Sequence, residues 1–230
     1  MVHGQVTMNS KDFEHKEALQ LALVDRIEAV IHAAISAHGD AHVLLSGGST
    51  PAFIYRALSE RPIQWSNVKI GLVDDRFVPS DDQYSNFRLL SDCFTQAEDV
   101  ELIPMVFYTN DEEENRIAAQ LAYAPFLRRI DYLLLGMGED GHTASLFPGN
   151  RSSEQSLSNN RIELVCTEAP VHPTRRISCS KELIIQSKQL DLLIVGETKK
   201  DVLDQAISTD LPIAIVARQS AELTVFYSPQ

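Results

Sequence analysis

A strand-like apolar run, a polar turn and a helical pattern follow one another repeatedly along the chain, and this succession constrains the fold most. It occurs at 42–60, at 131–149 and at 192–208, and residues 69–76 repeat its first half. Strands that alternate with helices favour a parallel sheet with right-handed crossovers, in which the carboxyl ends of the strands share one edge. The sequence therefore predicts an α/β fold around a mostly parallel, doubly wound sheet, with its polar turns gathered at that edge.

Segments outside these units complete the expected fold. Residues 14–38 carry apolar residues at helical spacing and stop at Gly39, a candidate C-cap. Residues 150–160 are rich in Ser and Asn, which predicts a mobile surface loop that can serve as a lid. Near the end of the chain, residues 213–217 predict a strand and residues 223–227 a β-rich tail.

The composition indicates a globular protein of one domain over residues 1–230, with 44% hydrophobic and 23% charged residues. No apolar run approaches the roughly 18 residues that a membrane-spanning helix needs. Residues 1–19 lack the basic start and apolar core of a secretory signal. The three cysteines are too few and too scattered for a disulfide framework or a zinc site. We therefore expect a cytoplasmic protein.

The formal net charge of −12 bears on the kind of partner. It argues against binding to a nucleic-acid backbone, because that contact depends on many Lys and Arg side chains. It does not exclude a small anionic ligand, since a few local cations and backbone N–H groups can hold a phosphate inside an acidic protein. The expected partner is a small molecule, with no nucleic acid and no membrane.

One polar turn has the composition of a phosphate-binding site. It follows the strand-like run 42–45 and precedes a helical pattern at 52–60, with Pro51 at the expected first helical position. The start of such a helix offers unpaired N–H groups and a partial positive charge, the glycines allow close approach, and the hydroxyls add donors. The alternative is a well-capped turn without a ligand. The candidate residues are Ser46, Gly47, Gly48, Ser49 and Thr50.

Two other turns carry titratable groups. The apolar run 132–135 ends in glycines and is followed by Asp140 and His142. An imidazole at the end of a strand can act as a general base near neutral pH. The Asp74-Asp75-Arg76 cluster follows the run 69–73 and can position a hydroxyl or stabilise developing negative charge. Taken singly, each turn could instead be an ordinary polar loop, but the shared sheet edge groups them, together with Lys199, into one predicted site.

Five motifs occur in order between residues 45 and 200: LSGGSTP at 45–51, VDDRFVP at 73–79 with a later SN, LLGMGEDGHTASLFPG at 134–149, PTRRIS at 173–178 and VGETKK at 195–200. In these motifs the chain resembles the 6-phosphogluconolactonases, a branch of the family that also holds glucosamine-6-phosphate deaminases and isomerases. The resemblance implies a three-layer, Rossmann-like α/β domain. It also implies a hydrolase of carbohydrate metabolism, in the pentose phosphate pathway, that opens a phosphorylated sugar lactone without a metal or other cofactor.

The resemblance also implies roles for residues. His142 matches the family's proposed general base, and Asp140 and Asp74 match acidic positions thought to orient the histidine or the substrate hydroxyls. Arg76 is a candidate for stabilising the oxyanion. The turn Ser46–Thr50 matches the phosphate cradle, with Arg176 and Lys199 as its charged partners. The choice between Arg175 and Arg176 stays open, although the spacing from Pro173 favours Arg176.

Two alternatives to lactone hydrolysis are open. In the related deaminases a glutamate precedes the proline of the histidine loop, whereas this chain has Phe147, and Arg76 stands where the deaminases have an aromatic residue. Both differences favour lactone hydrolysis. A sugar-phosphate sensor domain is the other alternative, but residues 1–40 predict one long helix and no helix-turn-helix with a basic face. The sequence leaves the oligomeric state open, as a monomer or small homo-oligomer.

Overall fold

A computed structural model describes residues 9–108, 110–206, 209–220 and 223–230. The amino-terminal stretch 1–19 that bears on a secretory signal lies partly outside these residues, as do the last two residues of the pattern at 192–208. Among the residues described, no helix is both long and apolar enough to cross a membrane.

The main sheet has seven strands, and every neighbouring pair in it is parallel. This confirms the predicted parallel α/β fold. In spatial order the strands are β1 (Asn9–Asp12), β10 (Leu223–Ser228), β9 (Leu190–Val195), β6 (Tyr132–Leu135), β2 (Ala41–Leu45), β3 (Val68–Leu72) and β5 (Glu101–Ile103).

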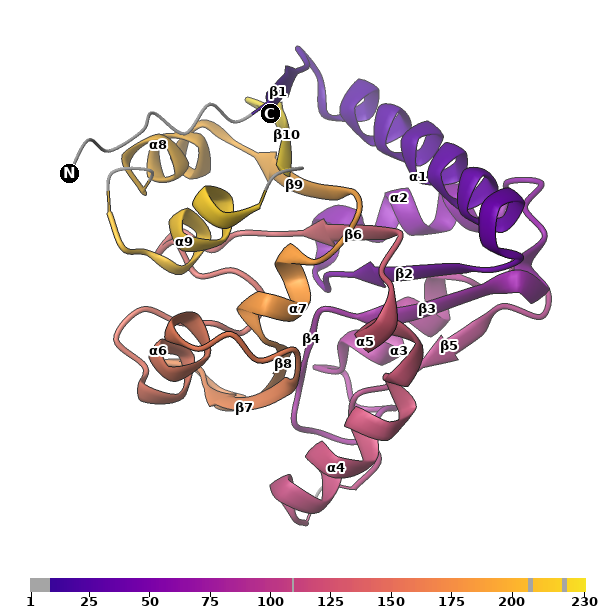
Figure 1. Ribbon diagram of the computed structural model, residues 1–230. Coiled ribbons are helices and arrows are strands. Elements are labelled where there is room, and N and C mark those ends of the chain that lie inside the picture. The colour runs from indigo at the N-terminus through magenta and orange to yellow at the C-terminus, as the bar shows by residue number, and fades with distance from the viewer. Residues whose placement is uncertain (1–8, 109, 207–208, 221–222) are drawn as a thin grey trace.

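Helices cover both faces of this sheet, which makes the three layers (Figure 1). On one side lie α1 (Lys16–His38) and α2 (Ser49–Ser59), and on the other α5 (Ala124–Arg128), α7 (Lys181–Ile185) and α9 (Pro212–Gln219). Because both faces are covered, the central strands β2 and β6 are buried at every residue and need continuous apolar runs. The remaining helices are α3 (Asn86–Cys93), α4 (Glu112–Ala122), α6 (Arg151–Ser158), α8 (Glu197–Ala206) and a 3₁₀ turn at Trp65–Asn67.

Helix α1 follows its predicted bounds closely. It buries Leu23, Ile27 and Ile31 against the sheet and ends at Gly39, which adopts φ 85° and donates its N–H to the carbonyl of Ile35. Only a residue that tolerates the left-handed region fits this cap without strain, which explains the glycine.

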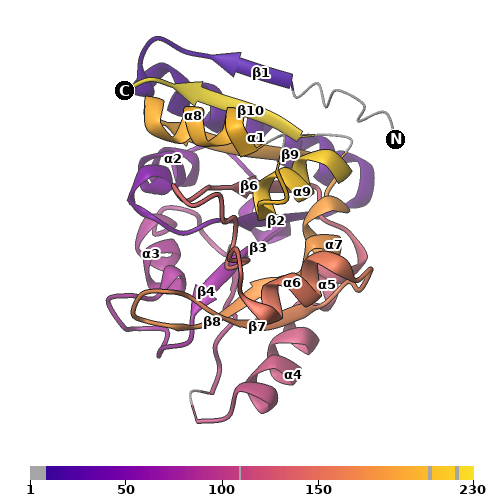
Figure 2. The ribbon, with the colours of Figure 1, turned by 90° about the vertical axis from the view of Figure 1, so that its left-hand side faces the viewer.

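A second sheet was not predicted. It consists of β4 (Asp74–Arg76), β8 (Arg175–Cys179) and β7 (Leu164–Glu168), paired antiparallel in the order β4-β8-β7. Figure 2 shows it beyond the β3 side of the main sheet, with α4 projecting past it. The cluster Asp74-Asp75-Arg76 is therefore a strand and not the polar turn that its composition indicates.

Three other expectations were wrong. Residues 150–160 contain helix α6, capped by Asn150, whose side chain accepts the N–H of Ser153 at 2.9 Å, so the predicted loop is wrong, whereas a role as a lid stays a prediction. Residues 213–217 lie in helix α9, because Pro212 starts a helix that packs against α7 and α8. Helix α2 begins at Ser49, so Pro51 is its third residue and not its first.

Asp75 joins the second sheet to α3. Its carboxylate accepts the backbone N–H groups of Asn86 at 2.6 Å and Phe87 at 3.1 Å, and the hydroxyl of Ser85 at 3.2 Å. It also accepts the N–H of Arg76 at 2.7 Å. Burial raises the pKa of Asp75 to about 6, although these N–H groups act in the opposite direction. Asp75 therefore holds the segment between β4 and α3 in place from inside the protein.

Asp75→Asn should change how stability depends on pH. The folded-state pKa of about 6 lies above the ordinary value of 3.8, so the folded protein holds this proton more tightly than the unfolded chain. The stability that Asp75 contributes is therefore present at low pH and lost as the pH rises through about 6. Between pH 4 and 6.5 the free energy of unfolding of the wild type should fall by up to roughly 3 kcal/mol relative to that of the variant. Urea unfolding of both proteins across this range measures the difference; parallel curves would contradict the assignment.

Candidate active site

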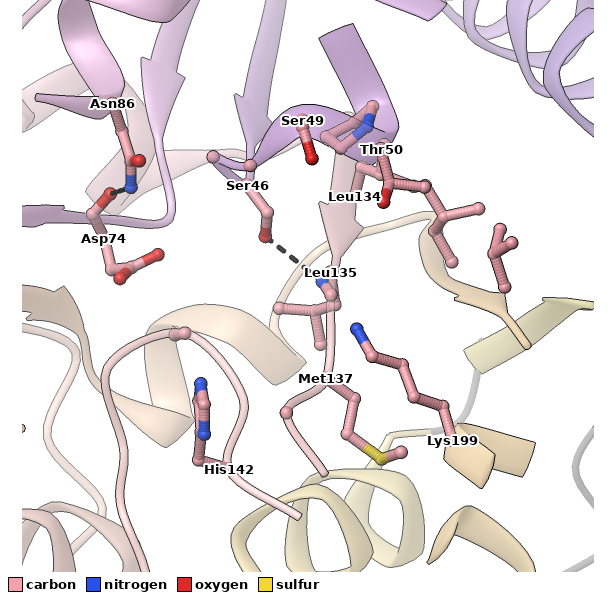
Figure 3. Close-up of a pocket in the computed structure, with 18 of the residues that line it drawn as sticks. Ser46, Ser49, Thr50, Asp74, Asn86, Leu134, Leu135, Met137, His142 and Lys199 are labelled. Atoms are coloured by element: carbon pink, nitrogen blue, oxygen red, sulfur yellow. Dashed lines mark hydrogen bonds between the residues drawn. The ribbon is translucent and has the colours of Figure 1, made fainter. Parts of the chain in front are cut away.

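A cavity of about 380 Å³ opens at the carboxyl ends of β2, β6 and β9. Its volume falls within the range of small-molecule sites. Of the predicted site residues, all except Asp140 line it: Ser46, Gly47, Gly48, Ser49, Thr50, Asp74, Arg76, His142, Arg176 and Lys199. The polar turns that the sequence grouped by a shared sheet edge therefore meet in space, and the glycine turn and His142 face the same cavity (Figure 3).

The glycine turn forms the upper wall in Figure 3. Ser46 accepts the N–H of Gly136 on its hydroxyl at 3.3 Å, which ties the turn after β2 to the turn after β6. A Cβ at position 47 would lie 2.0 Å from the Asn86 side-chain oxygen, so only glycine fits. Gly48 is the N-cap of α2 and has no side chain to cap it. The first turn of α2 thus begins beside the cavity with N–H groups available to an anion.

His142 is oriented by Asp140. Its ring Nδ1 lies 2.5 Å from the Asp140 carboxylate, which also accepts the His142 backbone N–H at 3.1 Å. Partial burial pushes the pKa of Asp140 up, but the backbone N–H and the ring of His142 outweigh it and hold that pKa below its ordinary value. The carboxylate is therefore ionised at neutral pH and favours a proton on Nδ1, which leaves Nε2 as the acceptor toward the cavity.

The imidazole also has little freedom to move. A Cβ at Gly138 would lie 2.2 Å from its Cε1 atom, so the glycine makes room for the ring. On another side the ring packs against Phe147, with 4.7 Å between the centroids. The related deaminases are expected to have a glutamate at position 147. In this chain Phe147 places an apolar ring beside the histidine instead.

Two arginines are directly opposite each other on neighbouring strands of the second sheet. Arg76 on β4 is the register partner of Arg176 on β8, and both line the cavity. Burial lowers the pKa of Arg176, and the charge of Arg76 lowers it further. No described carboxylate forms an ion pair with either guanidinium. Like charges directly opposite in a sheet destabilise it, so this pair favours an anion between or beside the two groups.

Arg175 points away from the cavity. Its guanidinium pairs with Glu112 and lies 4.4 Å from the centre of the Phe77 ring. Successive residues of a strand face opposite sides, so one arginine of the pair reaches the cavity and the other cannot. Of the two arginines, Arg176 lines the cavity and is therefore the one that the geometry favours as a ligand contact.

Lys199 reaches the cavity from the first turn of α8. Figure 3 shows its side chain entering on the side away from Asp74, with its amine directed toward Leu135. Among the residues that the structure describes, no carboxylate pairs with this amine. The cationic groups therefore approach the cavity from three elements, β4 and β8 of the second sheet and helix α8.

Several lining residues were missed. Met137 and four residues near the ends of β6 and β9 form the apolar part of the wall. The four are Leu134, Leu135, Leu193 and Val195, and their only signal in the sequence was their position in the two apolar runs. Asn86, in the SN pair of the second motif, donates its amide to the carbonyl of Asp74 at 2.9 Å. The described residues contain no group of three His, Cys, Asp or Glu side chains suited to a metal ion.

Comparison with known proteins gives consistent matches over nearly the whole chain. Residues 14–225 match the family described as glucosamine-6-phosphate isomerases/6-phosphogluconolactonase. A 6-phosphogluconolactonase of Rhizobium meliloti is 35% identical, over 97% of this chain and 100% of its own length. A 6-phosphogluconolactonase of Neisseria meningitidis is 33% identical, over 94% and 97% respectively.

Solved structures agree. The crystal structure of a 6-phosphogluconolactonase from Shewanella baltica has a TM-score of 0.91 and 34% sequence identity, over 96% of this chain and 98% of that one. The family profile covers both the glycine turn and the histidine loop, whose side chains line one cavity here. The chain belongs to the glucosamine-6-phosphate isomerase/6-phosphogluconolactonase family.

Proposed function

We propose that this protein hydrolyses 6-phospho-D-glucono-1,5-lactone to 6-phosphogluconate, the lactone-opening step of the oxidative pentose phosphate pathway. The observation that carries the proposal is that one imidazole, oriented by Asp140, lines a single cavity together with Arg76 and Arg176. Relatives about one third identical over nearly their full length carry the name of this activity.

In this mechanism His142 is the general base. Its Nε2 takes a proton from a water molecule while the water oxygen attacks the lactone carbonyl carbon. Arg76 stabilises the negative charge that develops on the carbonyl oxygen. When the tetrahedral intermediate collapses, the bond from the carbonyl carbon to the ring oxygen breaks, and the imidazolium returns the proton to that oxygen. Asp140 holds the ring in the tautomer that this exchange needs, and Asp74 orients a substrate hydroxyl.

The phosphate group is assigned to the glycine turn. Ser46, Gly47, Gly48, Ser49 and Thr50 offer hydroxyl and backbone donors at the start of α2, and Lys199 and Arg176 add positive charge. Anchoring the phosphate this way leaves the sugar ring to extend across the cavity toward His142.

We place this activity in the cytoplasm, in a single domain that acts as a monomer or small homo-oligomer. The support is the free thiol of each of the three cysteines, together with a family match that spans 14–225.

Incubation with two substrates tests the assignment. The purified protein should accelerate opening of 6-phosphogluconolactone above its spontaneous hydrolysis and release no ammonia from glucosamine 6-phosphate. Ammonia release without lactone hydrolysis would assign the chain to the deaminases. Tight binding of either compound without turnover would make it a sensor domain.

His142→Ala should reduce kcat by about 10²- to 10⁴-fold, because it removes the imidazole that exchanges the proton in this mechanism. The dissociation constant for 6-phosphogluconate should stay nearly unchanged, since the phosphate contacts remain. His32→Ala, on the exposed side of α1, is the matched control. A kcat close to that of the wild type would remove His142 from its role.

Lys199→Ala and Arg176→Ala should each raise KM about 10- to 100-fold, since a charge-assisted contact contributes roughly 1.5–3 kcal/mol. The chain offers a neighbouring control for each. Lys200 pairs with Asp204, and Arg175 pairs with Glu112, so Lys200→Ala and Arg175→Ala should leave KM within about twofold. Unchanged KM values in both site variants would move the phosphate elsewhere.

A further inference from the structure

Three charged side chains share one wall of the cavity, and each is held by a neutral group. The Asp74 carboxylate accepts the Ser145 hydroxyl at 2.5 Å. Arg76 donates from Nη1 to the carbonyl of Tyr84 at 2.7 Å, and Arg176 donates from Nε to the carbonyl of Pro173 at 2.9 Å. Across the described residues, no ion pair joins Asp74 to either arginine.

The absence of that ion pair needs a physical cause, because the three groups lie on one face of the second sheet. Asp74 is opposite Ser178 in the β4–β8 register, and Arg76 is opposite Arg176. Positions two apart on a strand point to the same side. The charge of Asp74 acts to raise the pKa of Arg176, although burial and the charge of Arg76 outweigh it. A carboxylate in this position would ordinarily turn toward the guanidinium groups.

Ser145 prevents that turn, since it is fixed from three sides. Its backbone N–H donates to the Ser178 hydroxyl at 3.2 Å, and its carbonyl accepts the Thr167 hydroxyl at 2.7 Å. Its own hydroxyl donates to Asp74, and the residue is fully buried. Ala144, directly before it, is held at φ 51°, a strained conformation that persists only where neighbours determine it. The backbone that carries the hydroxyl is therefore fixed, which limits how far the hydroxyl can follow the carboxylate.

We propose that Ser145 is a positioning residue that holds Asp74 away from Arg76 and Arg176, so that both guanidinium charges stay available to the phosphorylated substrate. The inference rests on the proposed function for the identity of that substrate. One oxygen of Asp74 is bound to the hydroxyl, and the side chain also lines the cavity, where the other oxygen can accept a substrate hydroxyl. Without the hydroxyl, the substrate would first have to break an internal ion pair, which lowers its apparent affinity.

Ser145→Ala tests this step. Loss of a hydrogen bond to a carboxylate should raise KM for the lactone, and the dissociation constant of 6-phosphogluconate, by about 10- to 100-fold. Ser187→Ala is the matched control, because it removes a buried hydroxyl that donates to a main-chain carbonyl, that of Ile184, away from the cavity. It should change both constants by less than about threefold. Equal effects of the two variants would reduce Ser145 to a structural role.

A double-mutant cycle separates positioning from simple loss of stability. In an Asp74→Asn background there is no carboxylate charge to pair with the arginines, so adding Ser145→Ala should change the dissociation constant by less than about threefold. Multiplicative effects of the two changes would overturn the inference. If Ser145→Ala does not fold, Ser145→Cys keeps the volume with a weak donor, and the same shift is expected.

A crystal structure of the Ser145→Ala variant tests whether Asp74 turns toward the arginines, independently of the identity of the substrate. An oxygen of Asp74 within about 4 Å of a guanidinium nitrogen of Arg76 or Arg176 is the expected result. A carboxylate that keeps its wild-type position would overturn the inference even if the lactone is hydrolysed. Wild-type protein that leaves the lactone unhydrolysed would instead overturn the proposed function.

Discussion

Main-chain pairing of β2 with β6, and of β6 with β9, is the constraint from which the site follows. Leu45 is in register with Leu134, and Leu135 with Leu192, so β2 and β6 end within one residue of each other and β9 runs three residues farther. The pairing continues one step into the turn, where the N–H of Ser46 donates to the carbonyl of Leu134 at 3.1 Å. Turns that are about 90 residues apart in sequence are thereby held side by side. This is the edge at which open α/β sheets bind ligands.

The second sheet adds what the first cannot supply. Side chains at the ends of the parallel strands are mostly glycine, hydroxyl and apolar groups, whereas β4 and β8 bring Asp74, Arg76 and Arg176 to the cavity. Ser145 then joins the two parts, because it lies in the histidine loop after β6 and contacts residues of β4, β7 and β8. The buried hydroxyl of Ser145 thus links the loop that carries the proposed base His142 to the strand that carries Asp74 and Arg76.

Much of the fold and most polar residues of the site could be predicted, because both leave local signals. Apolar runs that end in glycine locate β2, β6 and β9, and the motifs locate the polar side chains. The antiparallel pairing of the second sheet leaves no such signal, since β4 has three residues and all are charged. Helix α6 was missed because its Ser and Asn residues favour turns. The Asn150 cap, the hydroxyl of Ser153 that accepts the N–H of Phe147, and packing against β7 hold it in place. The contact of Ser145 with Asp74 spans 71 positions, and no periodicity encodes it.

The arginine pair shows how function limits stability here. The protein carries a net charge of −12, so long-range attraction does not bring a phosphorylated substrate to it, and local groups must do so. Arg76 and Arg176 can do this because their partners are carbonyl oxygens, which orient a guanidinium without neutralising it. The same arrangement keeps two like charges together in a partly buried wall, at a cost to the folded state that a carboxylate partner would remove. A carboxylate there would stabilise the fold and compete with the substrate, so the neutral partners are what binding requires.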